Sequence, residues 1–242
     1  MKLKIFSFFI TVMLIFYSFP LASAAEEETD PVWEGVAFFG DSTTHGLIRY
    51  IVNADDKLGI PVVALTRDQI LTPPDGTFYL RNLHTTRILY HNKKLSMEEV
   101  IQCAAPRLLI VTVGVNGLPH WEKECFTQLY NRLLDMFSAA SPDTQIILQS
   151  VFPTAKIRAP HLKNFTVNRV NEVNHWIEEI AASRNLVYIN SADALKGEDG
   201  WLCPSYQNGD GLHLNTAGFN QVLLTIQSAL KAQKGNVVIN EN

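Results

Sequence analysis

The stretch "FFGDSTTHGL" (residues 38–47) sets two apolar residues before a glycine and a row of small polar residues. It closes the apolar segment 32–40, which predicts a short strand, and it leads into a helical pattern. Asp, Ser and Thr are the residues that helix N-termini favour. The stretch therefore predicts a strand-to-helix corner that presents Ser42. That serine is either part of a helix cap or a nucleophile, and a nucleophile needs a base from elsewhere in the chain.

Strand and helix patterns alternate through the rest of the chain. The apolar run at 106–116 is continuous and rich in β-branched residues, which is typical of a central parallel strand covered on both faces. Alternation of this kind predicts an α/β domain with a mostly parallel, five-stranded sheet between two layers of helices. The other predicted strands are 61–65, 145–151 and 186–190, and the predicted helices are 47–59, 96–105, 119–140, 163–184 and 216–232.

Two local patterns refine this outline. Ser96 and Glu99 form a capping box that predicts the start of the helix at 96–105. Residues 66–95 have no clear periodicity. Within them, "LTPPDGTFYL" (71–80) predicts a turn, and "RILYHNKKL" (87–95) predicts short strands.

The N-terminus has the three-part layout of a secretory signal peptide. Lys2 and Lys4 precede an apolar run over 5–19, and small residues stand at 22–24. The run is shorter than the roughly 20 residues that span a bilayer. We therefore predict cleavage after residue 24, leaving residues 25–242 as a single domain that is secreted or lies in the cell envelope. The alternative is an uncleaved membrane anchor. No later stretch predicts a stable membrane span.

The charge balance bears on the choice of partner. The predicted signal peptide carries two of the 20 basic residues and no acidic residue, so the remainder of the chain has 18 basic and 24 acidic residues. A net negative chain without basic clusters argues against nucleic acid as a partner. We therefore predict no nucleic-acid partner.

The cysteines and two of the histidines give no metal pattern. Cys103 and Cys125 fall in apolar helical patterns, which predicts buried thiols, while Cys203 lies in a loop and its pairing stays open. His84 and His91 are loosely spaced, without acidic or cysteine companions in the sequence. We predict neither a metal nor a cofactor.

Four chemistry-bearing side chains follow or lie near the predicted strand ends. Ser42 follows the first strand and Asn116 ends the strand at 106–116. "NGDGLHLNTAGF" (208–219) then brings Asp210 and His213 just before the last helix. In parallel α/β sheets the ligand crevice lies at the carboxyl ends of the strands, so we expect these side chains to meet there. Histidine can take the serine proton, a carboxylate can orient the histidine, and an amide can stabilise an oxyanion.

The blocks "GDST", "GVN" and "DGLH" together resemble the spaced motifs of the SGNH hydrolases, also called GDSL esterases and lipases. Their order and spacing agree over nearly the whole predicted mature chain. The resemblance implies a flavodoxin-like three-layer α/β/α fold with Ser42 as nucleophile, His213 as base and Asp210 as its orienting acid. It also implies an oxyanion hole built from Asn116 and the backbone N–H of Ser42.

The sequence departs from this family pattern in two places. Gly117 stands where many members have aspartate, although the oxyanion asparagine is kept. The family's second block, which supplies an oxyanion glycine, has no clean copy. Gly76 in "PPDGT" is the better candidate for that role and Gly59 the weaker one.

By analogy with this family, we interpret the chain as an exported serine ester hydrolase that acts on a small-molecule or polysaccharide ester. O-acetyl groups on a carbohydrate or the cell wall are the first substrate hypothesis. The alternatives are a lipid esterase or lysophospholipase, an O-acyltransferase, and a non-catalytic carbohydrate-binding protein on the same scaffold. Three further residues near the site in sequence have less defined roles. We expect a structural hydrogen-bonding role for Asp41 and a surface position for His45, and we expect Trp201 either to line the crevice or to pack.

Overall fold

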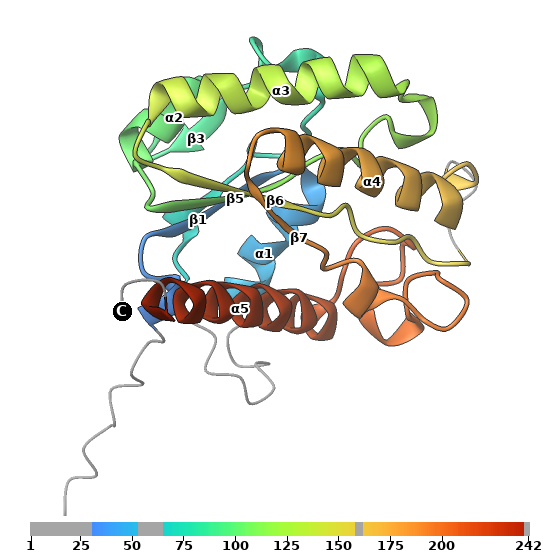
Figure 1. The fold of residues 1–242 in the computed structure, drawn as a ribbon. Helices are drawn as coiled ribbons and strands as arrows, with labels where there is room; N and C mark the ends of the chain where they lie inside the picture. Colours follow the sequence, from blue (N-terminus) through green and yellow to red (C-terminus); the bar gives the residue numbers. More distant parts are fainter. Residues whose placement is uncertain (1–30, 53–64, 158–161, 240–242) are drawn as a thin grey trace, which may run out of the picture.

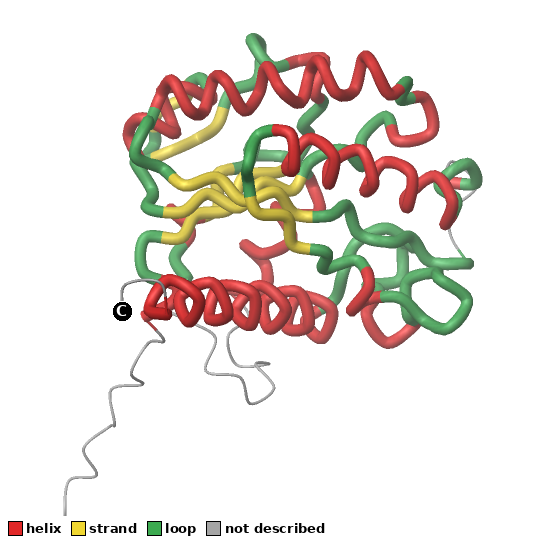
Figure 2. Tube along the Cα trace, in the orientation of Figure 1, coloured by secondary structure: helices red, strands yellow, loops and turns green. Residues whose placement is uncertain are grey.

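A computed structural model describes residues 31–52, 65–157 and 162–239. A five-stranded parallel sheet forms its centre, in the order β2-β1-β5-β6-β7. Helices lie on both faces of the sheet and make the three-layer α/β/α arrangement that the sequence predicts (Figures 1 and 2). The strands are β1 (Val36–Gly40), β2 (Ile70–Leu71), β5 (Leu108–Thr112), β6 (Gln145–Gln149) and β7 (Val187–Ile189).

Neighbouring residues of each central strand face opposite helical layers. Phe39 packs into the core with α2, α3 and α4, whereas Phe38 packs into the core with α1 and α5. Both faces of the sheet are therefore covered by apolar side chains, which explains the unbroken apolar runs in the sequence. The helices are α1 (Ser42–Val52), α2 (Met97–Ala104), α3 (Lys123–Ala140), α4 (Val167–Ser183) and α5 (Thr216–Ile239).

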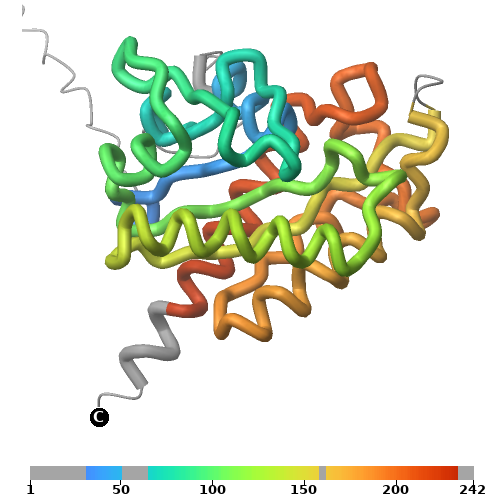
Figure 3. Tube along the Cα trace, turned by 90° about the horizontal axis from the view of Figure 1, so that it is seen from above, coloured from blue at the N-terminus to red at the C-terminus, as the bar shows by residue number. Residues whose placement is uncertain are grey.

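The strand order reverses beside β1. The chain first places β2 on one side of β1 and then, after α2, places β5 on the other side. Figure 3 shows the consequence, with residues 65–95 in cyan to green toward one edge of the sheet and α4 in orange toward the other. The carboxyl ends of β1 and β5 thus flank a topological switch point, where ligands bind in folds of this type.

The segment between β1 and α2 holds the least predictable structure. The predicted strand 61–65 lies outside the described residues except for Leu65, which is not in a strand. Among the described residues, Ile70–Leu71 pairs with β1 as the next strand of the sheet. A short hairpin, β3 (Ile88–Tyr90) with β4 (Lys93–Leu95), confirms the strands expected within 87–95. Its two turn residues, His91 and Asn92, both have positive φ, as the tight hairpin turn requires.

Helix boundaries follow from local contacts. The predicted capping box is confirmed, since the Ser96 hydroxyl accepts from the N–H of Glu99 and the Glu99 carboxylate accepts from the N–H of Ser96. The helix predicted over 47–59 already begins at Ser42, and residues 53–59 lie outside the described part. Short 3-10 turns are η1 (Pro31–Trp33), η3 (Arg67–Gln69), η4 (Leu80–Asn82), η5 (Leu118–His120), η7 (Asp193–Leu195) and η8 (Pro204–Tyr206).

The prediction for two of the cysteines was wrong. Cys103 is exposed and Cys125 is only half-buried, and both are free thiols, as is Cys203. The buried stripe of α2 runs through Val100 and Ile101, and Cys103 stands two positions further on, where the helix has turned away from the sheet.

Within the described residues, none of the helices is both long and apolar enough to cross a membrane.

Candidate active site

The corner between β1 and α1 positions Ser42. A Cβ on Gly40 would lie 2.0 Å from Thr44 Oγ1 and 2.4 Å from the carbonyl oxygen of Thr112, so only glycine fits there. The buried Asp41 carboxylate accepts from the backbone N–H of Thr43 at 3.0 Å and from its hydroxyl at 2.7 Å. Asp41 therefore has the structural hydrogen-bonding role expected for it, which leaves the Ser42 hydroxyl available for other partners.

The environment of Asp41 is unusual for a carboxyl group. Burial raises its pKa to about 6, although hydrogen bonds from Thr43 and Val115 and the nearby His213 oppose the rise. The contact with Val115 also ties the serine corner to the end of β5. Asp41 thus lies beneath both strand ends that form the site.

Ser42, His213 and Asp210 form one row of hydrogen-bonded side chains. His213 Nε2 lies 2.9 Å from Ser42 Oγ, and His213 Nδ1 lies 2.7 Å from Asp210 Oδ2. Ser42 and His213 are 171 positions apart in sequence, and the fold brings them into contact. This is the arrangement in which a base takes the serine proton while a carboxylate fixes the tautomer of the base.

A compact turn holds Asp210 and His213 in this orientation. Asp210 Oδ1 accepts from the backbone N–H groups of Leu212 at 2.8 Å and His213 at 2.9 Å. Partial burial raises the Asp210 pKa, but the hydrogen bonds from His213 and Leu212 outweigh that effect, and the net pKa is lowered. The carboxylate therefore stays ionised beside the imidazole at neutral pH.

Asn116 lies across the switch point from Ser42, just beyond β5. One N–H of its amide donates to the carbonyl of Phe78 at 2.8 Å, and the other has no hydrogen bond within the described residues. The backbone N–H of Ser42 belongs to the first turn of α1, where N–H groups have no partner within the helix. Two donors of the kind that stabilise an oxyanion therefore come from the two strand ends.

Behind Asn116 lies a support that sequence reasoning did not assign to the site. The indole N–H of Trp121 donates to the carbonyls of Gly114 at 3.2 Å and Asn116 at 3.1 Å. Arg169 on α4 donates in turn to the carbonyls of Leu118 and Trp121. Trp121 lies between η5 and α3 and is 4% exposed, so it is a core residue whose N–H also holds the end of β5 in place.

Gly76 packs against the serine corner. A Cβ on Gly76 would lie 3.0 Å from both Ser42 Cα and His45 Cβ, and its φ of +72° favours glycine. Its own N–H donates to the carbonyl of Pro73 at 2.9 Å, so this donor serves the turn. An oxyanion role for Gly76 therefore stays a prediction, and the weaker candidate, Gly59, lies outside the described residues.

His45 is not the surface residue expected from its position. It is half-buried, and its Nδ1 lies 3.0 Å from Thr72 Oγ1. Burial lowers its pKa and the nearby Arg67 adds to this effect, so the ring stays neutral at neutral pH. Trp201 is half-buried in the loop between η7 and η8, and its role toward the crevice stays a prediction.

The chain is a carboxylic ester hydrolase, as its family shows. The chain belongs to the GDSL-like Lipase/Acylhydrolase family, whose model matches residues 38–220 and thereby includes Ser42, Asn116, Asp210 and His213. This agrees with the resemblance found in the sequence motifs. No curated protein matches the chain.

Solved structures confirm the fold. A GDSL-like lipase from Bacteroides thetaiotaomicron is 18% identical with a TM-score of 0.55, covering 82% of this chain and 88% of that one. A carbohydrate esterase family 3 protein from Talaromyces cellulolyticus is 16% identical with a TM-score of 0.52, covering 83% and 98%. A family 3 carbohydrate esterase from Clostridium thermocellum is 13% identical with a TM-score of 0.50, covering 82% and 97%.

Proposed function

We propose that the chain is a serine esterase that removes short acyl groups, acetyl above all, from carbohydrate. The observation that carries the proposal is the contact row Ser42 Oγ, His213 and Asp210, at 2.9 and 2.7 Å. A serine hydroxyl becomes nucleophilic when an oriented imidazole accepts its proton. No step needs a cofactor.

The reaction follows from these positions. Ser42 Oγ attacks the ester carbonyl carbon while His213 Nε2 takes the serine proton. The negative charge that develops on the carbonyl oxygen is met by the amide of Asn116 and the backbone N–H of Ser42. His213 then protonates the departing alcohol oxygen and leaves an acyl group on Ser42. Water attacks this acyl-enzyme, gives its proton to His213, and releases the carboxylic acid and the free serine.

Several observations support the substrate class. The turn at Gly76 packs against the Ser42 corner, where a Cβ on Gly76 would lie 3.0 Å from Ser42 Cα, and we infer from this a narrow crevice that favours a short acyl group. Among proteins of the same fold are carbohydrate esterases, and a polysaccharide ester agrees with the absence of basic clusters in the sequence. The signal-peptide pattern at residues 1–24 supports an extracytoplasmic substrate such as an envelope glycan.

The test compares the wild-type chain with Ser42→Ala and with Ser228→Ala, which alters an exposed serine on α5. We would measure labelling by a fluorophosphonate and turnover of chromogenic esters with acyl chains of increasing length. We expect labelling and turnover in the wild type and in Ser228→Ala, neither in Ser42→Ala, and the highest kcat/KM for the acetyl ester.

Other results would change the proposal in defined ways. A preference for long acyl chains would indicate a lipid esterase, and transfer of the acyl group to an added sugar in place of water would indicate an acyltransferase. A folded wild type that neither labels nor turns over any ester would refute the catalytic role of Ser42. It would leave a carbohydrate-binding protein as the remaining hypothesis.

A further inference from the structure

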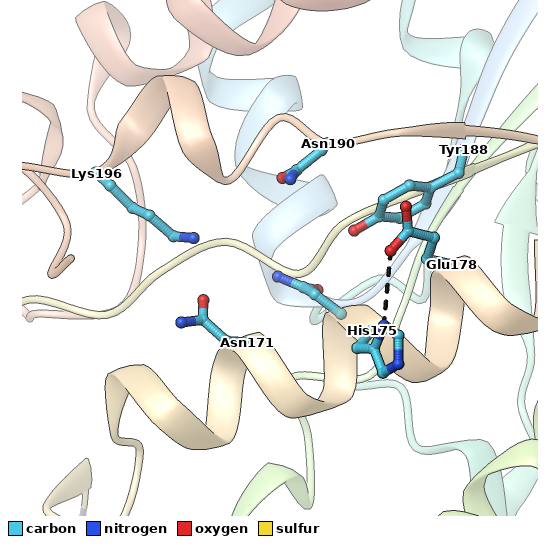
Figure 4. Close-up of a pocket in the computed structure, with 7 residues that line it drawn as sticks. Asn171, His175, Glu178, Tyr188, Asn190 and Lys196 are labelled. Atoms are coloured by element: carbon cyan, nitrogen blue, oxygen red, sulfur yellow. Dashed lines mark ion pairs between the residues drawn. The ribbon is translucent and has the colours of Figure 1, made fainter.

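A polar cavity of about 180 Å³ lies between α4 and the carboxyl end of β7, and its lining residues do not include Ser42, Asp210 or His213. In the described sheet β7 pairs with β6 alone, so no further described strand covers its outer edge. Figure 4 shows side chains from α4, from β7 and from the loop that follows β7 around the same space. The cavity is thus formed by three separate segments of the chain.

The charged groups of the cavity argue against an anionic ligand. Lys196 Nζ lies 2.7 Å from Asp193 Oδ1, so the only lysine among the described lining residues is already paired. Glu178 adds a carboxylate, which lies 3.7 Å from His175 Nδ1. A phosphate or carboxylate ligand would therefore meet a fixed negative charge and no unpaired lysine.

Neutral hydrogen-bonding groups make up most of the remaining lining. The amide of Asn171 has no hydrogen bond within the described residues, and Figure 4 shows it beside Lys196. Asn190 donates one side-chain N–H to Asp193 Oδ2 at 2.8 Å, and its second N–H has no hydrogen bond within the described residues. Both amides therefore have donor capacity left for a ligand, and Asn171 has acceptor capacity as well.

Two further lining groups are held rigidly. Asn174 accepts from the N–H of Val151 at 2.7 Å and donates to its carbonyl at 2.9 Å, which fixes the amide plane. The Tyr188 hydroxyl bonds to Ser150, and burial raises the Tyr188 pKa, so the phenol remains neutral at physiological pH. Fixed polar groups reduce the ordering cost of binding.

We propose that this cavity binds one neutral sugar ring of a glycan. Sugar hydroxyls both donate and accept hydrogen bonds, which matches amide and phenol groups in a cavity whose described lysine is already paired. The volume is below the roughly 300 to 1,000 Å³ of sites for drug-sized ligands, so it suits a single ring. The inference goes beyond the proposed function, because binding here needs no turnover at Ser42.

The test is an NMR titration of the ¹⁵N-labelled full chain with cellotetraose and with tetra-N-acetylchitotetraose, which carry no ester. We expect at least one of them to shift the side-chain amide signals of Asn171 and Asn190. Asn171→Ala should raise the Kd by about threefold to tenfold, the effect of one or two lost hydrogen bonds. It should not harm folding, because the Asn171 amide has no hydrogen bond to the described residues and alanine favours helices.

The matched control is Gln128→Ala, which removes an exposed amide from α3 and should bind like the wild type. Inorganic phosphate should leave the cavity signals unchanged, and Asn171→Ala should hydrolyse chromogenic acetate at the wild-type rate. The proposal is overturned if neither oligosaccharide shifts these signals, if Asn171→Ala binds with the wild-type Kd, or if phosphate binds in the cavity. None of these outcomes depends on whether Ser42 is the nucleophile.

Discussion

Replacing Asp210 by asparagine should remove catalysis while leaving the fold intact. The two carboxylate oxygens have different partners, since Oδ1 accepts from two backbone N–H groups, whereas Oδ2 meets His213 Nδ1 at 2.7 Å. Asparagine can keep its oxygen on the two backbone N–H groups, so the turn survives. Its NH₂ group must then face Nδ1 and donate a hydrogen bond to it.

The magnitude follows from the proton on the imidazole. An Nδ1 that accepts a hydrogen bond forces the proton onto Nε2, and that nitrogen can no longer take the proton of Ser42. In a serine protease the same exchange lowers kcat by about 10⁴, which corresponds to roughly 5.5 kcal/mol in the barrier. The lost charge of the carboxylate acts in the same direction, since the imidazolium that forms during attack loses its counter-ion.

The assay compares Asp210→Asn with Asp210→Ala on a chromogenic acetate ester and by thermal unfolding. Both variants should lose activity, but only alanine removes the two backbone hydrogen bonds, each worth about 0.5 to 1.5 kcal/mol. The Tm of the asparagine variant should therefore match the wild type, and that of the alanine variant should fall by several degrees. A folded Asp210→Asn that keeps more than a tenth of wild-type kcat would refute the assigned role of the carboxylate.

Three further perturbations test the supports of the site. Trp121→Phe removes the N–H that holds the Asn116 carbonyl, so kcat for the acetate ester should fall about tenfold with little change in KM; a rise in KM alone would contradict this. Gly40→Ala places a Cβ 2.0 Å from Thr44 Oγ1, and urea unfolding should show a loss of about 3 kcal/mol or more, whereas near wild-type stability would contradict the steric argument. The Asp41 pKa rises from 3.8 to about 6 on folding, so the folded state binds the proton more tightly. This carboxyl should therefore lower the free energy of unfolding by ~2 kcal/mol as pH increases from 4 to 6. That decrease should be missing in Asp41→Asn when unfolding is followed across the same pH range, and an identical pH profile in the variant would assign it to other groups.

Much of the site could be predicted from sequence because its parts lie in locally encoded elements. The corner at Ser42 is defined by a strand, a glycine and helix-capping residues, and the rule for ligand crevices places it beside Asn116. Asp210 and His213 are three positions apart in one turn, so their contact is local. The only long-range contact that the prediction needed is the one between this turn and Ser42. The alternating strands and helices imply a fold in which the two meet.

The second strand of the sheet escaped prediction for a physical reason. Ile70–Leu71 contributes two residues, too few to show a period, and it counts as a strand only because β1 offers hydrogen-bonding partners. The exposure of Cys103 was missed for a related reason. An apolar sequence pattern does not fix the rotation of a short helix, which is decided by how Val100 and Ile101 pack on the neighbouring elements.

The sequence by itself determined the α/β alternation and the family, and it predicted the roles of Ser42, Asn116, Asp210 and His213. Each of these depends on residues close together in the chain or on motifs in a fixed order. Only the tertiary structure decided the rest: that Asp41 is buried beneath both strand ends, that the Trp121 N–H holds the carbonyl of Asn116, and that α4, β7 and the loop after β7 line a polar cavity. Burial, pKa shifts and cavities arise from groups that meet across long sequence separations. A sequence pattern does not show which distant residues come into contact, and only the folded chain does.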